Sequence, residues 1–199
     1  LAKKIFIPLT VGGGIKSIDD IKRVLNNGAD KIAINSSAIK NPAFISEAAN
    51  IFGSSTISVS IEAQKYNSEY YAYTESGRNF SGKKVYDWVK EIEKRGAGEI
   101  IITSIGHEGL RKGVDEELIS KVTDISNLPI VASGGVGSIN DVINILNSNI
   151  SISGIAIASC FHYYYLNNLL SVHKEGNQDY LKGIRDKFDK HSFSIEELK

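Results

Sequence analysis

Methionine is absent from the 199 residues, and cysteine, tryptophan and proline are scarce, with one, one and three copies. The single cysteine, Cys160, excludes an internal disulfide framework and a multi-cysteine zinc site, and it suits a reducing compartment such as the cytoplasm. Neither charge is in excess, because 23 basic side chains balance 23 acidic ones, which excludes a polybasic nucleic-acid binder. No apolar run reaches the ~18 residues of a membrane span, so we expect neither nucleic acid nor membrane as a partner.

The lack of methionine also bears on the start of the chain, which is Leu1. A translated gene begins with methionine, so we expect this sequence to be a fragment of a longer protein. Its length is nevertheless ample for a buried core in one large domain or two small ones.

Short, β-branched apolar runs alternate with segments whose apolar residues recur at helical spacing. In the first helical segment, Ser17 is placed to cap the helix and Gly28 to end it. The runs are nearly continuously apolar, as in strands buried on both faces, and the alternation predicts an α/β fold with a parallel sheet. The predicted strands are Ile5–Leu9, Lys31–Asn35, Ile57–Glu62, Glu99–Ser104, Ile130–Ser133 and Ile155–Ser159.

A segment near residues 64–82 departs from this alternation. The run Tyr70–Thr74 is rich in aromatic residues, which favour strands, and a turn signal follows it at residues 76–79. We therefore predict a small hairpin inserted after the third strand. Its aromatic cluster is interpreted as a packing face in preference to a ligand platform.

The sequence contains an internal repeat in which a Gly-Gly loop joins a strand to a helix. Residues 13–21 (GGIKSIDDI) recur as residues 134–142 (GGVGSINDV), and each copy continues through a helix to a strand with a serine-bearing turn. Duplicated half-units of this kind predict a β/α barrel, with an open doubly wound sheet as the alternative.

Each copy offers the backbone N–H groups that a phosphate needs. Glycines directly after a parallel strand let a ligand approach the backbone, and the next helix adds partial positive charge. Two copies indicate two phosphate sites and an elongated bisphosphate substrate, whereas a lone Gly-Gly turn would more often only tighten a loop. The predicted phosphate-binding residues are Gly13, Gly14, Asn35 and Ser36 in one copy, and Gly134, Gly135, Ala158 and Ser159 in the other.

Two carboxylates follow neighbouring predicted strands. Glu62 ends the third strand, and Glu108 lies in the loop after the fourth. In a barrel the carboxyl ends of the strands carry the active site, so this pair suits general acid–base catalysis. A solvated loop glutamate is the alternative for Glu108, and His107 beside it is interpreted as an ordinary loop residue.

Lys31 and Glu99 begin the second and fourth predicted strands, at the opposite end of the sheet. Their spacing alone indicates a structural charged ring around the bottom opening of a barrel.

Four segments resemble the cyclase subunit of imidazole glycerol phosphate synthase, and the likeness extends over about residues 5–163. The segments are Phe6–Ile15 (FIPLTVGGGI), Gly28–Ser36 (GADKIAINS), Gly96–Ile105 (GAGEIIITSI) and Ala132–Ser138 (ASGGVGS).

This resemblance implies a (β/α)8 barrel of the ribulose-phosphate-binding type, and we expect its first two β–α units to be absent from this chain. It implies a heterodimer with a glutaminase subunit, whose ammonia enters through the bottom of the barrel. Ammonia would then convert a phosphoribulosyl-formimino aminoimidazole carboxamide nucleotide into imidazole glycerol phosphate and aminoimidazole carboxamide ribotide, in histidine biosynthesis. We expect no metal and no cofactor.

Residue by residue, the phosphate-binding positions given above match the family, and Lys31 and Glu99 match two members of its ammonia gate. Glu62 replaces the second catalytic aspartate and is one methylene longer, whereas the first catalytic aspartate lies upstream of Leu1. The loop that usually reads Asp-Arg-Asp-Gly-Thr reads GHEGL at residues 106–110 and contains Glu108.

These departures leave two alternatives. One is a paralogue that conducts ammonia to a sugar-amidating enzyme in surface-polysaccharide synthesis, and the other is an inactive fragment. In every case we expect a single partial barrel domain over residues 1–199, with a polar insertion near residues 166–190. The final segment, Phe193–Lys199, resembles the start of the family's last helix.

Overall fold

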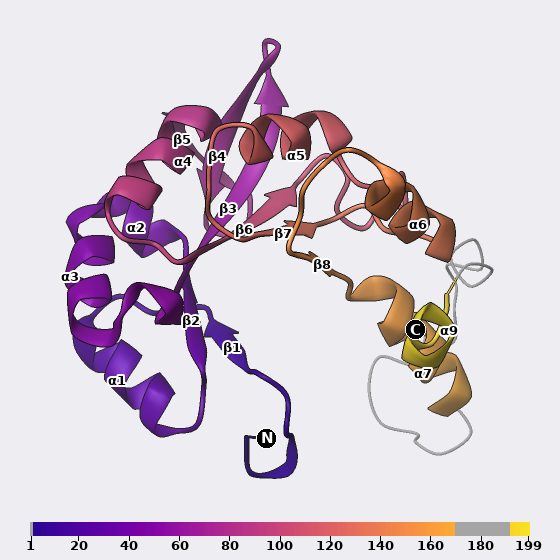
Figure 1. Cartoon of the computed structure of the whole chain (residues 1–199), viewed down its shortest axis with the longest axis horizontal. Helices are drawn as coiled ribbons and strands as arrows, with labels where there is room; N and C mark the ends of the chain where they lie inside the picture. The colour runs from indigo at the N-terminus through magenta and orange to yellow at the C-terminus, as the bar shows by residue number, and fades with distance from the viewer. Residues whose placement is uncertain (1, 170–191) are drawn as a thin grey trace.

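The computed structural model describes residues 2–169 and 192–199. Six parallel strands form a sheet in the order β1-β2-β3-β6-β7-β8, and helices line its convex side, so that the sheet curls into an open arc (Figure 1). A doubly wound sheet would carry helices on both faces, and the β/α-barrel prediction is therefore confirmed. The strands of the arc are β1 (Thr10–Gly12), β2 (Lys31–Ile34), β3 (Ile57–Tyr66), β6 (Glu99–Ser104), β7 (Ile130–Ser133) and β8 (Gly154–Ala156).

Helices connect successive strands along the chain. Among the described residues, none of them is long and apolar enough to cross a membrane. The predicted polar insertion near residues 166–190 lies almost wholly outside the described residues. The α-helices are α1 (Ile18–Asn26), α2 (Ser36–Lys40), α3 (Ala43–Phe52), α4 (Val85–Lys94), α5 (Glu116–Thr123), α6 (Ile139–Asn147), α7 (Ser159–Leu169) and α9 (Ile195–Leu198), and short 3-10 helices span Ala2–Lys4 and Ser54–Thr56.

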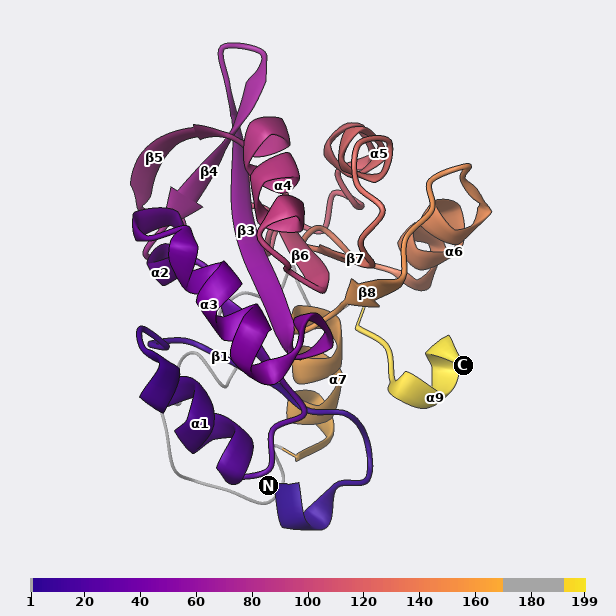
Figure 2. The ribbon, with the colours of Figure 1, turned by 60° about the vertical axis from the view of Figure 1, so that its left-hand side comes forward.

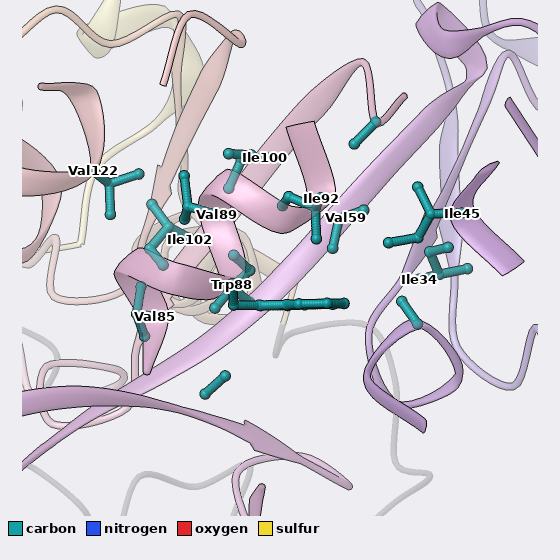
Figure 3. Close-up of a cluster of buried hydrophobic side chains, with 14 of the residues drawn as sticks. Ile34, Ile45, Val59, Val85, Trp88, Val89, Ile92, Ile100, Ile102 and Val122 are labelled. Atoms are coloured by element: carbon teal, nitrogen blue, oxygen red, sulfur yellow. The ribbon is translucent and has the colours of Figure 1, made fainter. Parts of the chain in front are cut away.

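The core lies between the convex side of the sheet and the helices. Strand residues such as Val59 and Ile102 are buried beside Trp88 of α4 (Figure 3). Burying one such aliphatic side chain contributes about 1.5–3 kcal/mol. The alternate strand residues, including Ala33 and Ser60, are only half-buried on the concave side. The expectation of two fully buried faces is therefore wrong, because no layer of the described residues packs across the concave side.

The predicted hairpin near residues 64–82 is present and extends to residue 84, with two antiparallel strands, β4 (Glu69–Thr74) and β5 (Asn79–Lys84). Figure 2 shows β3 running beyond the parallel sheet into this hairpin. Asn67 and Ser68 make the tight β3–β4 turn with φ angles of 48° and 67°, values typical of a two-residue hairpin loop. On the hairpin, the ring centroids of Tyr71 and Phe80 lie 5.1 Å apart.

Four predicted strand ranges differ from the structure. β2 ends at Ile34, one residue early, and β3 runs past Glu62 to Tyr66 because it continues into the hairpin. The two edge ranges differ more. Ile5–Leu9 is not a strand; β1 begins at Thr10, because its register partner in β2 is Lys31, the first residue of that strand. Because the two strands are parallel, the residues before Thr10 lie beyond the amino end of β2. At the other edge, Ile155–Ser159 shortens to β8, because β7 ends at Ser133 and offers β8 no partner beyond Ala156.

The internal repeat is preserved in the backbone. Ser17 caps α1 and Ser138 caps α6, each by accepting a hydrogen bond from the backbone N–H of an aspartate three residues later. That aspartate, Asp20 or Asp141, accepts hydrogen bonds in return from the backbone of the capping serine. These reciprocal capping boxes fix where both helices begin, as predicted for Ser17.

Candidate functional site

Both Gly-Gly loops lie at the carboxyl edge of the sheet. Gly13 and Gly14 follow β1, and Gly134 and Gly135 follow β7. Because all six strands of the arc are parallel, their carboxyl ends share one edge. The first loop stands beside the end of β2, the second beside the end of β8, and β3 and β6 lie between them. The two loops therefore lie on one edge of the sheet, as expected from their places after parallel strands, and their expected position at opposite ends of a shared groove stays a prediction.

The first loop borders a cavity of about 660 Å³. Gly13, Gly14, Asn35 and Ser36 all line it, so the structure brings the first set of predicted phosphate residues together. Asn35 Oδ1 is buried without a hydrogen-bond partner in the described residues, and so is the hydroxyl of Ser37, which also lines the cavity. Unpaired buried polar atoms are costly, and a ligand bound here could satisfy them.

Glu62 lines the same cavity from the carboxyl half of β3. Its Oε2 accepts hydrogen bonds from Asn35 Nδ2 at 3.1 Å and from the backbone N–H of Gly77 at 2.8 Å. Oε1 has no hydrogen-bond partner among the described residues. Two donors therefore fix the orientation of the carboxylate and leave one oxygen available for proton transfer.

The second loop lies beneath the segment 105–113 that follows β6. The backbone N–H of Gly113 donates to the carbonyl oxygen of Gly135 at 2.9 Å. Cys160, the residue after Ser159 in α7, donates its thiol to Val136 O at 3.2 Å, which ties α7 to this loop. Burial raises the pKa of the Cys160 thiol, so it serves here as a neutral donor.

Glu108 lies in the exposed part of the same segment, where its backbone N–H donates to Ser104 O at 2.9 Å. No hydrogen bond or ion pair joins its side chain to Glu62 in the described residues. Glu108 follows β6 as predicted, whereas Glu62 does not end its strand: it lies within β3, which runs on to Tyr66 because its last residues pair with β4. The expected facing pair stays a prediction.

A buried polar cluster holds the base of the segment. Asp115, the N-cap of α5, accepts hydrogen bonds from Tyr70 Oη at 3.0 Å, Ser104 Oγ at 2.7 Å and the backbone N–H of Leu118 at 3.2 Å. His107 Nδ1 lies 2.8 Å from Gly113 O, and its Nε2 lies 3.7 Å from Asp115 Oδ2. Burial, followed by the hydrogen bond to Asp115, raises the pKa of Tyr70 well above its usual range. His107, interpreted from the sequence as an ordinary loop residue, is thus part of a structural network.

At the opposite edge, Lys31 Nζ and Glu99 Oε2 form an ion pair at 2.7 Å, as expected from their places at strand starts. Ser58 Oγ donates to the other carboxylate oxygen, Glu99 Oε1, at 2.6 Å. Ser58 and Glu62 are four residues apart on β3 and therefore share the concave side, one at each end.

Sequence reasoning missed several of these residues. Ser58 could have been found by stepping back two residues at a time from Glu62, because alternate strand residues share a face. Asp115 carried a weak signal as a capping residue three positions before Leu118. Nothing in the sequence indicated that the turn containing Gly77 would contact Glu62.

Fold and site together define a β/α-barrel protein with a polar cavity at the carboxyl ends of its strands. The family model described as "Histidine biosynthesis protein" matches residues 1–167, and the chain belongs to this family of (β/α)8 barrels.

Individual relatives agree with this assignment. The chain is 47% identical over 162 residues to imidazole glycerol phosphate synthase subunit HisF of Natranaerobius thermophilus. It is 46% and 44% identical over 164 residues to the subunits of the same name from Staphylococcus saprophyticus and Staphylococcus aureus. Each match covers 81% of this chain and 64% of the relative, so the chain spans less than two thirds of these relatives.

Proposed function

We propose that this chain belongs to the cyclase subunit of imidazole glycerol phosphate synthase and acts as a lyase in cytoplasmic histidine biosynthesis. Its substrates would be ammonia and the phosphoribulosyl-formimino aminoimidazole carboxamide nucleotide. Its products would be imidazole glycerol phosphate and aminoimidazole carboxamide ribotide.

One observation carries the proposal: a carboxylate lies between two repeat-related Gly-Gly loops on one sheet edge. Glu62 of β3 is between the first loop, beside β2, and the second, beyond β6. A substrate with a phosphate at each end would span the loops and place its reacting centre near this carboxylate. Gly13, Gly14, Asn35 and Ser36 are the proposed ligands of one phosphate, and Gly134, Gly135, Ala158 and Ser159 those of the other.

Glu62 is the proposed general acid–base group, with Glu108 as a second carboxylate. Replacing Glu62 by Gln should lower ammonia-driven turnover of the nucleotide by about 100- to 10,000-fold, the usual contribution of such a group. Glu117→Gln removes an equal charge from α5, away from the cavity, and should leave turnover unchanged. Unaltered turnover in Glu62→Gln would overturn the assignment, and the same assay on Glu108→Gln decides whether that loop takes part.

A glutaminase subunit is the proposed partner, supplying ammonia at the amino edge where Lys31 and Glu99 are paired. The names of the relatives describe them as subunits, which supports an assembly of this kind. Lys31→Ala should reduce glutamine-dependent turnover more than turnover driven by free ammonia. Equal losses in the two assays would count against a gate.

The alternative is an ammonia-conducting paralogue. One feature favours it: the second Gly-Gly loop packs beneath residues 105–113, which leaves less room there for a substrate phosphate. Such a protein would deliver ammonia from its glutaminase to a separate sugar-amidating enzyme and would not convert the nucleotide. Assaying nucleotide conversion and ammonia transfer side by side separates the two functions.

A further inference from the structure

An ion pair lies at the edge of the first cavity. Lys40, the last residue of α2, donates to Glu75 Oε1 at 3.0 Å, and both residues line the cavity. Glu75 belongs to the turn between β4 and β5, 35 positions further along the chain. The hairpin therefore brings a carboxylate to the place where a phosphate is proposed to bind.

The same turn also contacts a proposed phosphate ligand. The backbone N–H of Glu75 donates to Ser36 Oγ at 3.1 Å. A serine hydroxyl that accepts one hydrogen bond still has its own proton to donate. Ser36 is thereby held with its donor available for an anionic oxygen.

The surroundings of Glu75 are basic. The hydrogen bond and charge of Lys40 hold the pKa of Glu75 below its usual value, and Lys16 and Arg78 add to this effect from further away. Lys16 also lines the cavity. The local field therefore favours an anion, and in the unliganded chain that anion is a carboxylate of the protein itself.

We propose that Lys40 is a ligand of the first phosphate and that Glu75 is a displaceable counter-anion, which the phosphate replaces on Lys40. This inference rests on the phosphate site of the proposed function. The Lys40 and Glu75 side chains are 68% and 49% exposed, and ion pairs this exposed contribute little stability, so opening the pair costs little. A phosphate carries more charge than a carboxylate and has more oxygens with which to bind Lys40 and Ser36 together.

The test is calorimetric titration of the full chain with inorganic phosphate at constant ionic strength. Glu75→Gln should bind phosphate about two- to fivefold more tightly, the range expected when an exposed ion pair no longer competes. Lys40→Met should bind phosphate about three- to tenfold more weakly, as expected for the loss of a charge-assisted hydrogen bond at an exposed site. In the double variant, Glu75→Gln should bring no tightening, because its effect acts through Lys40.

Glu117→Gln is the matched control, since Glu117 also pairs with lysines on an exposed surface but does not line the cavity. The inference would be overturned if Glu117→Gln bound phosphate more tightly, or if Glu75→Gln did so in the Lys40→Met background. Either result would mean that phosphate affinity responds only to the overall charge of the chain. Ser36→Ala separates the two proposals. If it weakens binding while Lys40→Met and Glu75→Gln do not, the phosphate site stands and the counter-anion does not. If neither the parent chain nor any variant binds phosphate, both proposals fail.

Discussion

The loop after β1 and the loop after β7 begin with the same Gly-Gly pair and end at the same kind of capping serine, yet their neighbours differ. A methyl group added to Gly14 would meet no atom within 4 Å. One added to Gly135 would lie 2.0 Å from the carbonyl oxygen of Gly113. The first loop borders an open cavity, whereas the second is packed against residues 105–113.

This difference separates what a repeated sequence determines from what it does not. Backbone angles and caps depend on neighbours within a few positions, and both copies share them. Accessibility depends on the segment that crosses each loop. After β3 the chain forms a hairpin whose turn borders the first cavity, and after β6 it forms a loop that covers the second Gly-Gly pair.

The largest expected effect comes from substituting the second glycine of each pair. Gly135→Ala should reduce the free energy of unfolding by about 3–5 kcal/mol, because a left-handed φ of 97° is combined with a backbone clash. Gly14→Ala meets only the strain of its φ of 71° and should lose about 1 kcal/mol. Urea unfolding of both variants provides the measurement. Equal losses would mean that the two loops have similar surroundings after all.

A somewhat smaller loss is expected from the cluster that fixes residues 105–113. Asp115→Asn keeps one acceptor oxygen, which can still serve Tyr70 and Leu118, but places an NH2 group opposite the Ser104 hydroxyl and loses that buried hydrogen bond, which should cost about 2–3 kcal/mol. Asp124→Asn, at the exposed end of α5, is the control and should change stability by less than about 0.5 kcal/mol. If both substitutions prove equally mild in chemical denaturation, the cluster does not hold the segment.

The capping box, which both loops share, predicts equal losses of stability. Ser17→Ala and Ser138→Ala each remove a capping box, and each should cost about 1 kcal/mol. Thermal unfolding of the two variants, with exposed Ser151→Ala as a control, measures the pair. If the two losses of stability differ by much more than the experimental error, the packing around the second loop also changes how much its cap stabilises the helix.

The smallest effect is a pH dependence confined to alkaline solution. Tyr70 has a raised pKa in the folded chain, so its contribution is fully present below the unfolded pKa of about 10 and is lost as pH rises above it. Unfolding free energies measured from pH 9 to 11 should therefore fall, and the fall should be less steep in Tyr70→Phe. The remaining slope includes Tyr86, whose pKa burial raises to about 12. An unchanged slope in Tyr70→Phe would contradict burial of this hydroxyl.

The sequence predicted the features that depend on local pattern. The ranges of β6 and β7 match the prediction, because each is a short apolar run bounded by turn residues. The predicted strand Ile5–Leu9 is wrong although its composition suits a strand, because β1 can pair only where β2 is alongside. Pairing partners are set by the fold, and composition alone does not reveal them.

In the candidate site, the first set of phosphate residues was predicted as a group because the repeat marks both of its loops. The contacts of Glu62 with Gly77, and of Lys40 with Glu75, were not predictable. They join positions 15 and 35 residues apart through a hairpin whose turn geometry has no sequence signature precise enough to place it. The role of Glu108 stays a prediction.

The length of β3 determines where this chain could accept extra residues. The strand pairs with β6 from Ser58 to Ala63 and with β4 from Glu62 to Tyr66. It therefore connects the amino edge of the sheet, its carboxyl edge and the hairpin. One residue inserted between Ser58 and Glu62 would turn one of them from the concave to the convex side and separate the amino-edge charges from the cavity. An insertion at Asn67–Ser68, beyond the last paired residues, would lengthen only an exposed tip. A peptide tag or reporter domain is therefore best placed in that turn, where both edges keep their register.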